Sequence, residues 1–104
     1  MALALAPLMK ADLAGGIVVD SKSGVTGSGR GLSDTTHYPN CNEAFSPYKV
    51  ASHRHTPEIE QTLSKLAGHE VKITFVPHLL PLNRGIISTC YVDLKKSMTA
   101  AQLH

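Results

Sequence analysis

Two histidines with an arginine between them form the segment of this chain best suited to proton transfer. They are His53, Arg54 and His55. An imidazole changes charge near neutral pH, and a guanidinium binds carboxylate or phosphate through two parallel hydrogen bonds. Because side chains two positions apart share a face of an extended segment, we expect both imidazoles on one side and Arg54 on the other.

A helix directly after these residues would hold them in place. Thr56 is a favourable N-cap, and Pro57 fits the first helical position. Glu58 suits the positive end of the helix dipole, and Gly68 is a natural stop. The apolar stripe between them consists of Ile59, Leu63 and Leu66. The pattern therefore predicts a helix over residues 56–67 that carries the two histidines at its start.

A second candidate site is the glycine-rich segment 23–31, where closely spaced glycines would let backbone N–H groups approach an anion. It lacks the Gly-Lys-Ser/Thr ending of a P-loop and the strand–helix context of a dinucleotide fingerprint. Arg30 could bind a carboxylate or phosphate, as could Arg84 in the turn 83–85. Hydroxyl groups are offered by Ser23, Thr26 and Ser28. The alternative interpretation is that both segments are solvated connections.

Length and composition indicate one small domain. The chain has 104 residues, of which 42% are hydrophobic, enough for a modest core. Its net charge is +2, and the basic residues are scattered without interleaved aromatics, so nucleic-acid binding is not indicated. The apolar start, 2–9, is too short to span a membrane and lacks the basic start of a secretory signal. Cys41 and Cys90 are far apart, which is typical of free thiols in a reducing cytoplasm or organelle matrix.

Hydrophobic periodicity and turn residues predict the remaining elements. Gly15 and Gly16 should break the first helix, which Pro7 disturbs, and Pro77 and Pro81 should end the second strand. In chain order, we expect a helix at 2–13, a strand at 17–20, a loop at 21–33, an irregular segment at 34–50, strands at 71–75 and 86–94, and a helix from 98 onward. This order predicts an α+β fold with an antiparallel pair of strands.

Three segments resemble one enzyme family in order and at length. They are Asp20 to Arg30 (DSKSGVTGSGR), His53 to Gln61 (HRHTPEIEQ) and Phe75 to Gly85 (FVPHLLPLNRG). They are similar to the second domain of the N-acetyl-gamma-glutamyl-phosphate reductases of arginine biosynthesis. The resemblance is weakest over 31–44. It implies an α+β domain whose mixed, largely antiparallel sheet has helices on one face, like part of the C-terminal domain of glyceraldehyde-3-phosphate dehydrogenase.

The chemistry implied by this resemblance is reduction of an acyl phosphate. A cysteine attacks the acyl phosphate and expels phosphate, NADPH hydride reduces the thioester to a semialdehyde, and a histidine assists proton transfer. The family's cysteine lies in an Asn-Pro-Gly-Cys-Tyr-Pro-Thr stretch that precedes the helix expected from Ala2, and its NADP-binding Rossmann domain is absent from this chain. We therefore expect residues 1–104 to be a partial catalytic and dimerisation domain that is inactive alone.

The resemblance also implies roles for individual residues. His53 is expected to be the acid/base with His55 nearby, and Glu58 to orient one imidazole. Because the adjoining helix N-terminus disfavours imidazolium, a histidine there remains available as a base. Substrate carboxylate or phosphate, or cofactor phosphate, would be bound by Arg54, Arg30 and Arg84. The NADP cofactor would lie beside Ser23, Gly24 and Ser28, with Asn83 near the nicotinamide, and no metal ligand is expected.

The resemblance implies a small acidic phosphorylated substrate. Because a domain cut from a larger one leaves unpaired strand edges and apolar patches, we expect a homo-oligomer or poor solubility. From the composition, we expect no nucleic-acid or membrane partner. The location would be the cytoplasm, or the plastid stroma in a plant.

Alternative functions follow from the residues alone. Cys41 or Cys90 could act as the nucleophile of an independent enzyme if a base lay within hydrogen-bond reach. The chain could also be a small-anion-binding module. A metal-binding module could use His37, His53 and His55, although no fourth ligand with recognised spacing is present.

Overall fold

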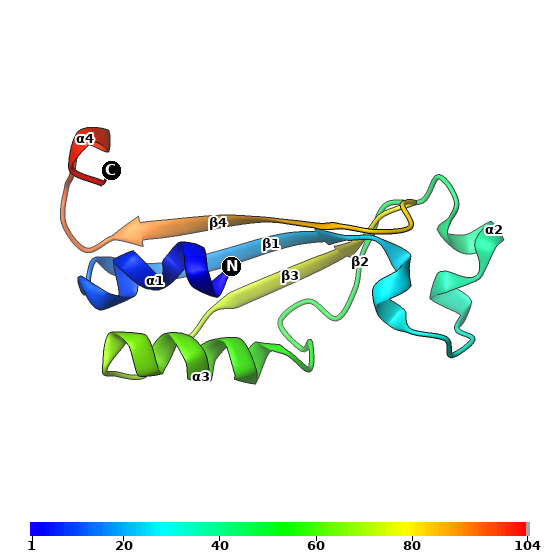
Figure 1. The fold of residues 1–104 in the computed structure, drawn as a ribbon, viewed down its shortest axis with the longest axis horizontal. Helices are drawn as coiled ribbons and strands as arrows, with labels where there is room; N and C mark the ends of the chain where they lie inside the picture. The colour runs from blue at the N-terminus through cyan, green and yellow to red at the C-terminus, as the bar shows by residue number, and fades with distance from the viewer. Residues whose placement is uncertain (104) are drawn as a thin grey trace.

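A four-stranded mixed sheet forms the centre of the molecule, with strand order β2-β3-β1-β4 (Figure 1). The structure is a computed structural model, and it describes residues 1–103. Its strands are β1 (Ala14–Ser23), β2 (Ser46–Pro47), β3 (Thr74–Leu79) and β4 (Ile86–Leu94). Its helices are α1 (Ala2–Lys10), α2 (Tyr38–Cys41), α3 (Thr56–Ala67) and α4 (Ala100–Leu103), with 3-10 turns at Val25–Ser28 and Asp34–Thr36.

Strand β1 holds the sheet together because both of its edges are paired. It runs parallel to β3 and antiparallel to β4, and β2 is antiparallel to β3. Its β-branched residues Ile17, Val18 and Val19 suit a pleated central strand. The prediction of an α+β fold with a mixed, largely antiparallel sheet is therefore confirmed.

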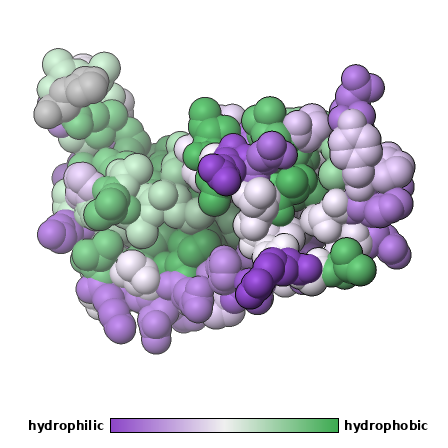
Figure 2. Space-filling view, turned by 45° about the vertical axis from the view of Figure 1, so that its right-hand side comes forward, coloured by the Kyte–Doolittle hydropathy of each residue, from purple (hydrophilic) through white to green (hydrophobic). Residues whose placement is uncertain are grey.

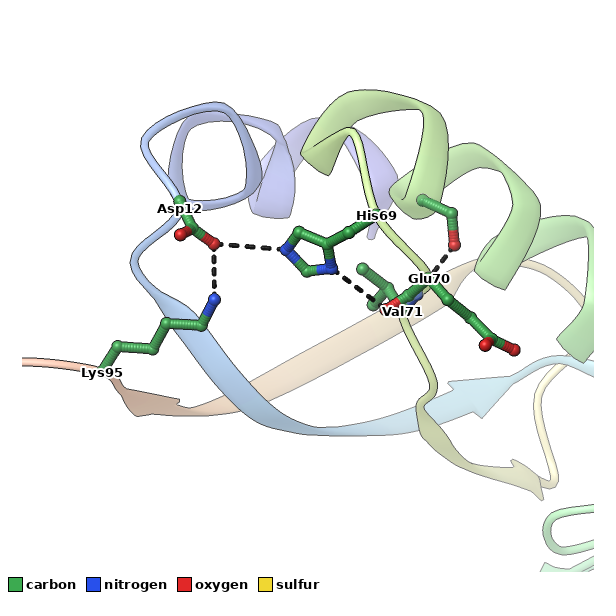
Figure 3. Close-up of polar contacts among 6 residues, drawn as sticks. Asp12, His69, Glu70, Val71 and Lys95 are labelled. Atoms are coloured by element: carbon green, nitrogen blue, oxygen red, sulfur yellow. Dashed lines mark hydrogen bonds and ion pairs between the residues drawn. The ribbon is translucent and has the colours of Figure 1, made fainter.

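Helices α1 and α3 lie side by side over one face of the sheet (Figures 1 and 3). Leu5 and Met9, one helical turn apart on α1, and Leu63 on α3 point inward. Burial of their apolar surface is the main force that holds the layers together. The buried core consists of Leu5, Met9, Ala14, Ile17, Val19, Leu63, Val71 and Phe75.

The opposite face of the sheet is left uncovered by these helices. Val18, Ile87 and Tyr91 share this face through the β1–β4 register, and their exposed fractions are 40%, 65% and 58%. The same face carries an ion-paired group in which Asp20 contacts both Lys22 and His78. This outer face therefore combines an apolar surface with a compact group of charges.

Two predicted strands have different bounds in the structure. β1 is longer than the expected 17–20, because Gly15 and Gly16 lie within it, at an irregularity in the β1–β4 register, instead of in a break. The strand expected at 71–75 is shifted to Thr74–Leu79 and contains Pro77.

Pro77 is tolerated inside β3 because its ring nitrogen faces the weakly paired edge. The Pro77 carbonyl accepts a hydrogen bond from the Tyr48 N–H on the β2 side, at 3.0 Å. In a strand, the N–H and C=O of one residue point the same way, so the missing donor also faces that side. The parallel ladder between β3 and β1 therefore continues through this position.

The segments expected as loop and irregular structure contain short regular pieces. Ser21–Ser23 extend β1, and Val25–Ser28 form a 3-10 turn in place of open loop. The segment 34–50 contains a second 3-10 turn, the four-residue α2 and the two-residue β2. The helix expected at 2–13 ends at Lys10 and includes Pro7, and the one expected from 98 begins at Ala100.

Helix α3 has the predicted bounds, Thr56–Ala67, and Gly68 ends it with a left-handed φ of 75°. Leu63 is fully buried, and Ile59 and Leu66 pack against the core. Figure 2 shows mostly polar side chains along the lower edge, where α3 lies in Figure 1, as expected for an amphipathic helix. Within residues 1–103, no helix has the length and apolar character needed to cross a membrane.

A charged cluster ties together the ends of three elements on the side of the molecule away from the glycine-rich segment (Figures 1 and 3). Asp12, just after α1, accepts hydrogen bonds from Lys95 after β4, at 2.5 Å, and contacts the Nε2 atom of His69 after α3, at 3.2 Å. These contacts and the Lys95 N–H···O=C Leu13 bond of 2.9 Å hold the connections at the ends of α1, α3 and β4 together.

Candidate functional site

A cavity of about 630 Å³ lies where β1 ends and α3 begins. Phe75 and Pro77 of β3 form part of its wall. The glycine-rich segment contributes Ser23, Gly24 and Ser28. The segment at the start of α3 contributes His53, Arg54, His55 and Glu58. The two segments that the sequence indicated as separate candidates therefore meet in one cavity.

A tight turn brings the histidine rings together. The Thr56 N–H donates to the His53 carbonyl at 2.9 Å, which closes the chain on itself before α3. The His53 and His55 ring centroids are 4.9 Å apart, with ring planes at 71°. The rings are therefore neighbours as expected, but through a turn and not through strand alternation. For the same reason Arg54, expected on the opposite side, also lines the cavity.

The start of α3 differs from the predicted capping. His55 occupies the N-cap position without a side-chain cap hydrogen bond, and Thr56 is the first helical residue. The Thr56 Oγ1 atom is buried and has no hydrogen-bond partner within residues 1–103. The N-cap is therefore His55 and not Thr56, so the prediction of Thr56 as N-cap is wrong although the predicted helix bounds hold.

Aromatic side chains enclose His53. Its ring meets Tyr48 at 5.6 Å and Phe75 at 5.3 Å between centroids, both edge to face. Burial is the largest cause that lowers the pKa of His53 below its ordinary value of 6.5, followed by the positive charges of His55, Lys49 and Arg54. The neutral imidazole is therefore the favoured form at neutral pH.

A backbone hydrogen bond determines the tautomer of that neutral ring. The His55 N–H donates to the Nδ1 atom of His53 at 3.2 Å. A backbone N–H can only donate, so Nδ1 carries the lone pair and Nε2 carries the proton. His53 therefore presents a hydrogen-bond donor at Nε2, the nitrogen that is free of this contact.

Glu58 lines the cavity from the first turn of α3. Within residues 1–103, the ion pairs between histidine and carboxylate are His69–Asp12 and His78–Asp20, and neither includes Glu58. The expected role of Glu58 in orienting an imidazole therefore stays a prediction.

The glycine-rich segment is held against the turn 83–85 by backbone contacts. The Gly24 N–H donates to the Gly85 carbonyl at 2.9 Å, and the Thr26 N–H and Oγ1 both donate to the Asn83 carbonyl. A Cβ at Gly24 would lie 2.8 Å from the backbone nitrogen of Arg84, so only glycine fits there. Asn83 and Arg84 contact this segment through their backbone atoms and do not line the cavity.

Arg30 lies in a different hollow. It lines a separate surface pocket of about 540 Å³ with Asp34, His37 and Tyr38. Of the three arginines predicted to bind an anion, Arg54 alone lines the main cavity, and His37 lies apart from His53 and His55. Within residues 1–103, no group of three or more side chains is placed to hold a metal ion.

Sequence reasoning missed several residues of the cavity. Tyr48 and Lys49 line it, as does Ser21, whose buried hydroxyl lies 2.6 Å from the hydroxyl of Ser88 on β4. A tyrosine and a lysine in a segment without regular periodicity carry no signal of their own. Ser21 could have been found by alternation from Val19, which faces the core.

The cysteines lie elsewhere. Cys41 and Cys90 are free thiols, and neither lines the cavity. Cys41 Sγ contacts the Thr36 carbonyl at 3.5 Å, and Cys90 packs against the core. The structure therefore gives no support to an independent cysteine enzyme built on this cavity.

Comparison with known proteins identifies relatives along the whole chain. The family model of the semialdehyde dehydrogenase dimerisation domain matches residues 1–104. The N-acetyl-gamma-glutamyl-phosphate reductase of Brachyspira hyodysenteriae is 59% identical over 105 residues, which cover 98% of this chain and 30% of that protein. The reductase of the same name from Moorella thermoacetica is 54% identical over 107 residues, with 97% and 30% covered.

The chain thus spans about 30% of the length of the curated relatives that it matches. The family model covers every residue of the chain, including the histidine turn and the glycine-rich segment that form the cavity. The chain belongs to the semialdehyde dehydrogenase dimerisation-domain family, and the resemblance seen in its three motifs is confirmed.

Proposed function

We propose that this chain is the dimerisation domain of an NADP-dependent reductase that converts N-acetyl-glutamyl phosphate to N-acetyl-glutamate semialdehyde. The observation that carries the proposal is the cavity, where two imidazoles and Arg54 meet the hydroxyls of Ser23 and Ser28. The names and identities of the relatives support the same substrate. The lining of the cavity includes no cysteine, so the proposed reaction takes its thiol nucleophile from outside it.

In this reaction, His53 would donate a hydrogen bond from Nε2 to the carbonyl oxygen of the substrate. Thiolate attack and hydride addition both place negative charge on that oxygen, and a preorganised donor in a half-buried site stabilises such charge. Collapse of the reduced adduct restores the C=O bond and expels the thiolate. A neutral His53 therefore needs to transfer no proton of its own.

The cofactor would meet this chain at one end only. The hydroxyls of Ser23 and Ser28 are donors and acceptors of the kind that bind a carboxamide, so these residues fit the nicotinamide end of NADP. NADPH supplies the hydride when bound. The place of Asn83 near the nicotinamide stays a prediction, as does phosphate binding by Arg30 and Arg84.

A chimaera tests the proposal without any assumption about the rest of the parent protein. Residues 1–104 replace the matching segment of the Brachyspira hyodysenteriae reductase, and NADP-linked turnover is measured in the phosphate-dependent direction with the semialdehyde. We expect activity in the chimaera and none in the 104-residue chain. A well-folded chimaera that fails to turn over the semialdehyde would refute the proposed substrate.

We also infer that the outer face of the sheet contacts a second copy of this chain. The matched family is described as a dimerisation domain, and this face is uncovered and partly apolar. Changing Tyr91→Glu should shift sedimentation towards monomer, since a charge would be buried against the partner. Leu3→Glu on α1, 92% exposed, is the matched control and should leave the sedimentation coefficient unchanged. Equal behaviour of the two variants would contradict the assignment of this face.

A further inference from the structure

The loop between β2 and α3 holds a strained backbone beside the cavity. Lys49 and Ala51 have φ angles of 46° and 52°, a left-handed conformation that is unfavourable for residues other than glycine. Both sides of this strained segment are tied to β3. The Tyr48 N–H donates to the Pro77 carbonyl at 3.0 Å, and the Ala51 N–H donates to the Phe75 carbonyl at 3.1 Å. The fold therefore fixes the position from which the Lys49 side chain emerges.

Lys49 adds a second permanent positive charge to the cavity lining. It lines the cavity together with Arg54, against the single carboxylate of Glu58. Within residues 1–103, neither Lys49 nor Arg54 is part of an ion pair. The cavity wall thus has two cations without a fixed counter-charge.

The field of these cations reaches His53. After burial and the charge of His55, the charges of Lys49 and Arg54 are the further causes that lower the pKa of His53. An anion that bound both cations would therefore lie close enough to change the protonation of this ring.

We propose that Lys49, together with Arg54, binds the phosphoryl group of the substrate beside His53. A doubly charged group with several oxygens can contact a lysine and an arginine at once, and both residue types are common phosphate ligands. A carboxylate has fewer oxygens and one charge, so it would gain less from the pair. The assignment rests on the proposed function for its natural ligand, whereas binding of inorganic phosphate depends on this chain alone.

The test is a titration of the His53 imidazole by NMR in the 104-residue chain, with and without inorganic phosphate at constant ionic strength. Phosphate should raise the pKa of His53 in the wild type, because a bound anion favours imidazolium. Lys49→Met should raise that pKa even without phosphate, and should weaken phosphate binding by about tenfold, as expected for loss of one charge-assisted hydrogen bond. Lys49→Arg should retain most of the binding.

The matched control is Lys65→Met, which removes the same charge from the last turn of α3 and should leave phosphate binding unchanged. The proposal is overturned if Lys49→Met binds phosphate as the wild type does, if Lys65→Met weakens binding equally, if the wild type binds no phosphate, or if acetate binds as tightly as phosphate. If the chimaera is inactive but phosphate binding still depends on Lys49, the proposed reaction is refuted and the proposed phosphate site is not.

Discussion

The two histidine clusters of this molecule show how neighbours decide what an imidazole can do. His53 receives a backbone N–H at Nδ1 and is surrounded by aromatic rings and cations, so its environment favours the neutral ring. His69 is exposed and lies between two oxygens, with Nδ1 at 3.0 Å from the Glu70 carbonyl and Nε2 at 3.2 Å from Asp12 Oδ1 (Figure 3).

These contacts have opposite chemical meaning. Both ring nitrogens of His69 face acceptors, and a ring N–H can donate to either of them. One nitrogen of His53 faces a donor, which only an unprotonated nitrogen can accept. The first arrangement suits a structural ion pair at the surface, and the second suits a polar group held ready for a ligand.

The largest difference between the clusters should appear in catalysis. In the chimaera, His53→Leu should lower kcat by about 10²- to 10³-fold, the range for loss of one hydrogen-bond donor to a developing oxyanion. His69→Leu should leave kcat within a factor of about two, because surface substitutions away from the site have small effects. Steady-state kinetics of the two variants side by side would decide this, and similar losses in both would refute the functional distinction.

The next largest effect concerns the wall of the His53 site. Phe75 is 5% exposed and touches both the core and the His53 ring. Phe75→Ala should lower the free energy of unfolding by about 3–5 kcal/mol. It should also raise the pKa of His53, because a more exposed imidazole is easier to protonate. Denaturant unfolding and an NMR titration measure the two effects.

The matched control for this wall is Tyr38→Ala on α2, where the side chain is 72% exposed. It should cost much less stability and leave the His53 titration unchanged. An unaltered pKa of His53 in Phe75→Ala would show that the aromatic wall is not what disfavours its charged form.

The pH dependence of stability should separate His53 from other groups. The pKa of His53 is lower in the folded chain than its ordinary value of 6.5, so the unfolded chain binds the proton more readily. Proton binding by the unfolded chain therefore destabilises the fold below the lowered pKa, and this effect fades as pH rises through 6.5. In wild type, the free energy of unfolding should therefore increase over that window.

Replacing His53 by Gln should flatten this part of the curve. Urea unfolding at several pH values would show it. If the free energies of unfolding of wild type and His53→Gln differ by the same amount at every pH, the assignment of this pH dependence to His53 is contradicted.

The smallest effect is expected at the exposed cluster. Hydrogen bonds from Lys95 and then His69 hold the pKa of Asp12 below its ordinary value. The attraction between the Asp12 carboxylate and these two partners is therefore lost as pH falls through that lowered value. Asp12→Asn should reduce the melting temperature only slightly, because exposed ion pairs contribute little. Thermal unfolding at low and high salt would show the difference shrinking with salt, and a loss as large as that of Phe75→Ala would contradict a surface role.

The sequence predicted elements best where local signals agreed. Helix α3 and strand β4 have the bounds expected from an apolar stripe ending at Gly68 and from a run rich in β-branched residues. The prediction for β3 was wrong about Pro77, because whether a proline can stay in a strand depends on which edge its nitrogen faces. That is a property of the assembled sheet and not of the residue.

The candidate site was predicted in its chemistry and only partly in its geometry. His53, His55, Arg54, Ser23 and Ser28 share a cavity, whereas Arg30 lines a neighbouring pocket and Arg84 lines neither of the two. Lys49 could not be recognised, since its left-handed backbone is imposed by hydrogen bonds to a strand reached much later in the chain.

The central position of β1 has a consequence for how the chain reaches its native state. Both partners of β1 come from far along the chain, residues 74–79 and 86–94, so no neighbouring hairpin can form around it first. During synthesis from the N-terminus, one edge of β1 would stay open until β3 has left the ribosome, and the other until β4 has left it. Such distant pairing slows folding and exposes strand edges to aggregation in the meantime. Arrest of synthesis before residue 86 should therefore yield a nascent chain that remains protease-sensitive.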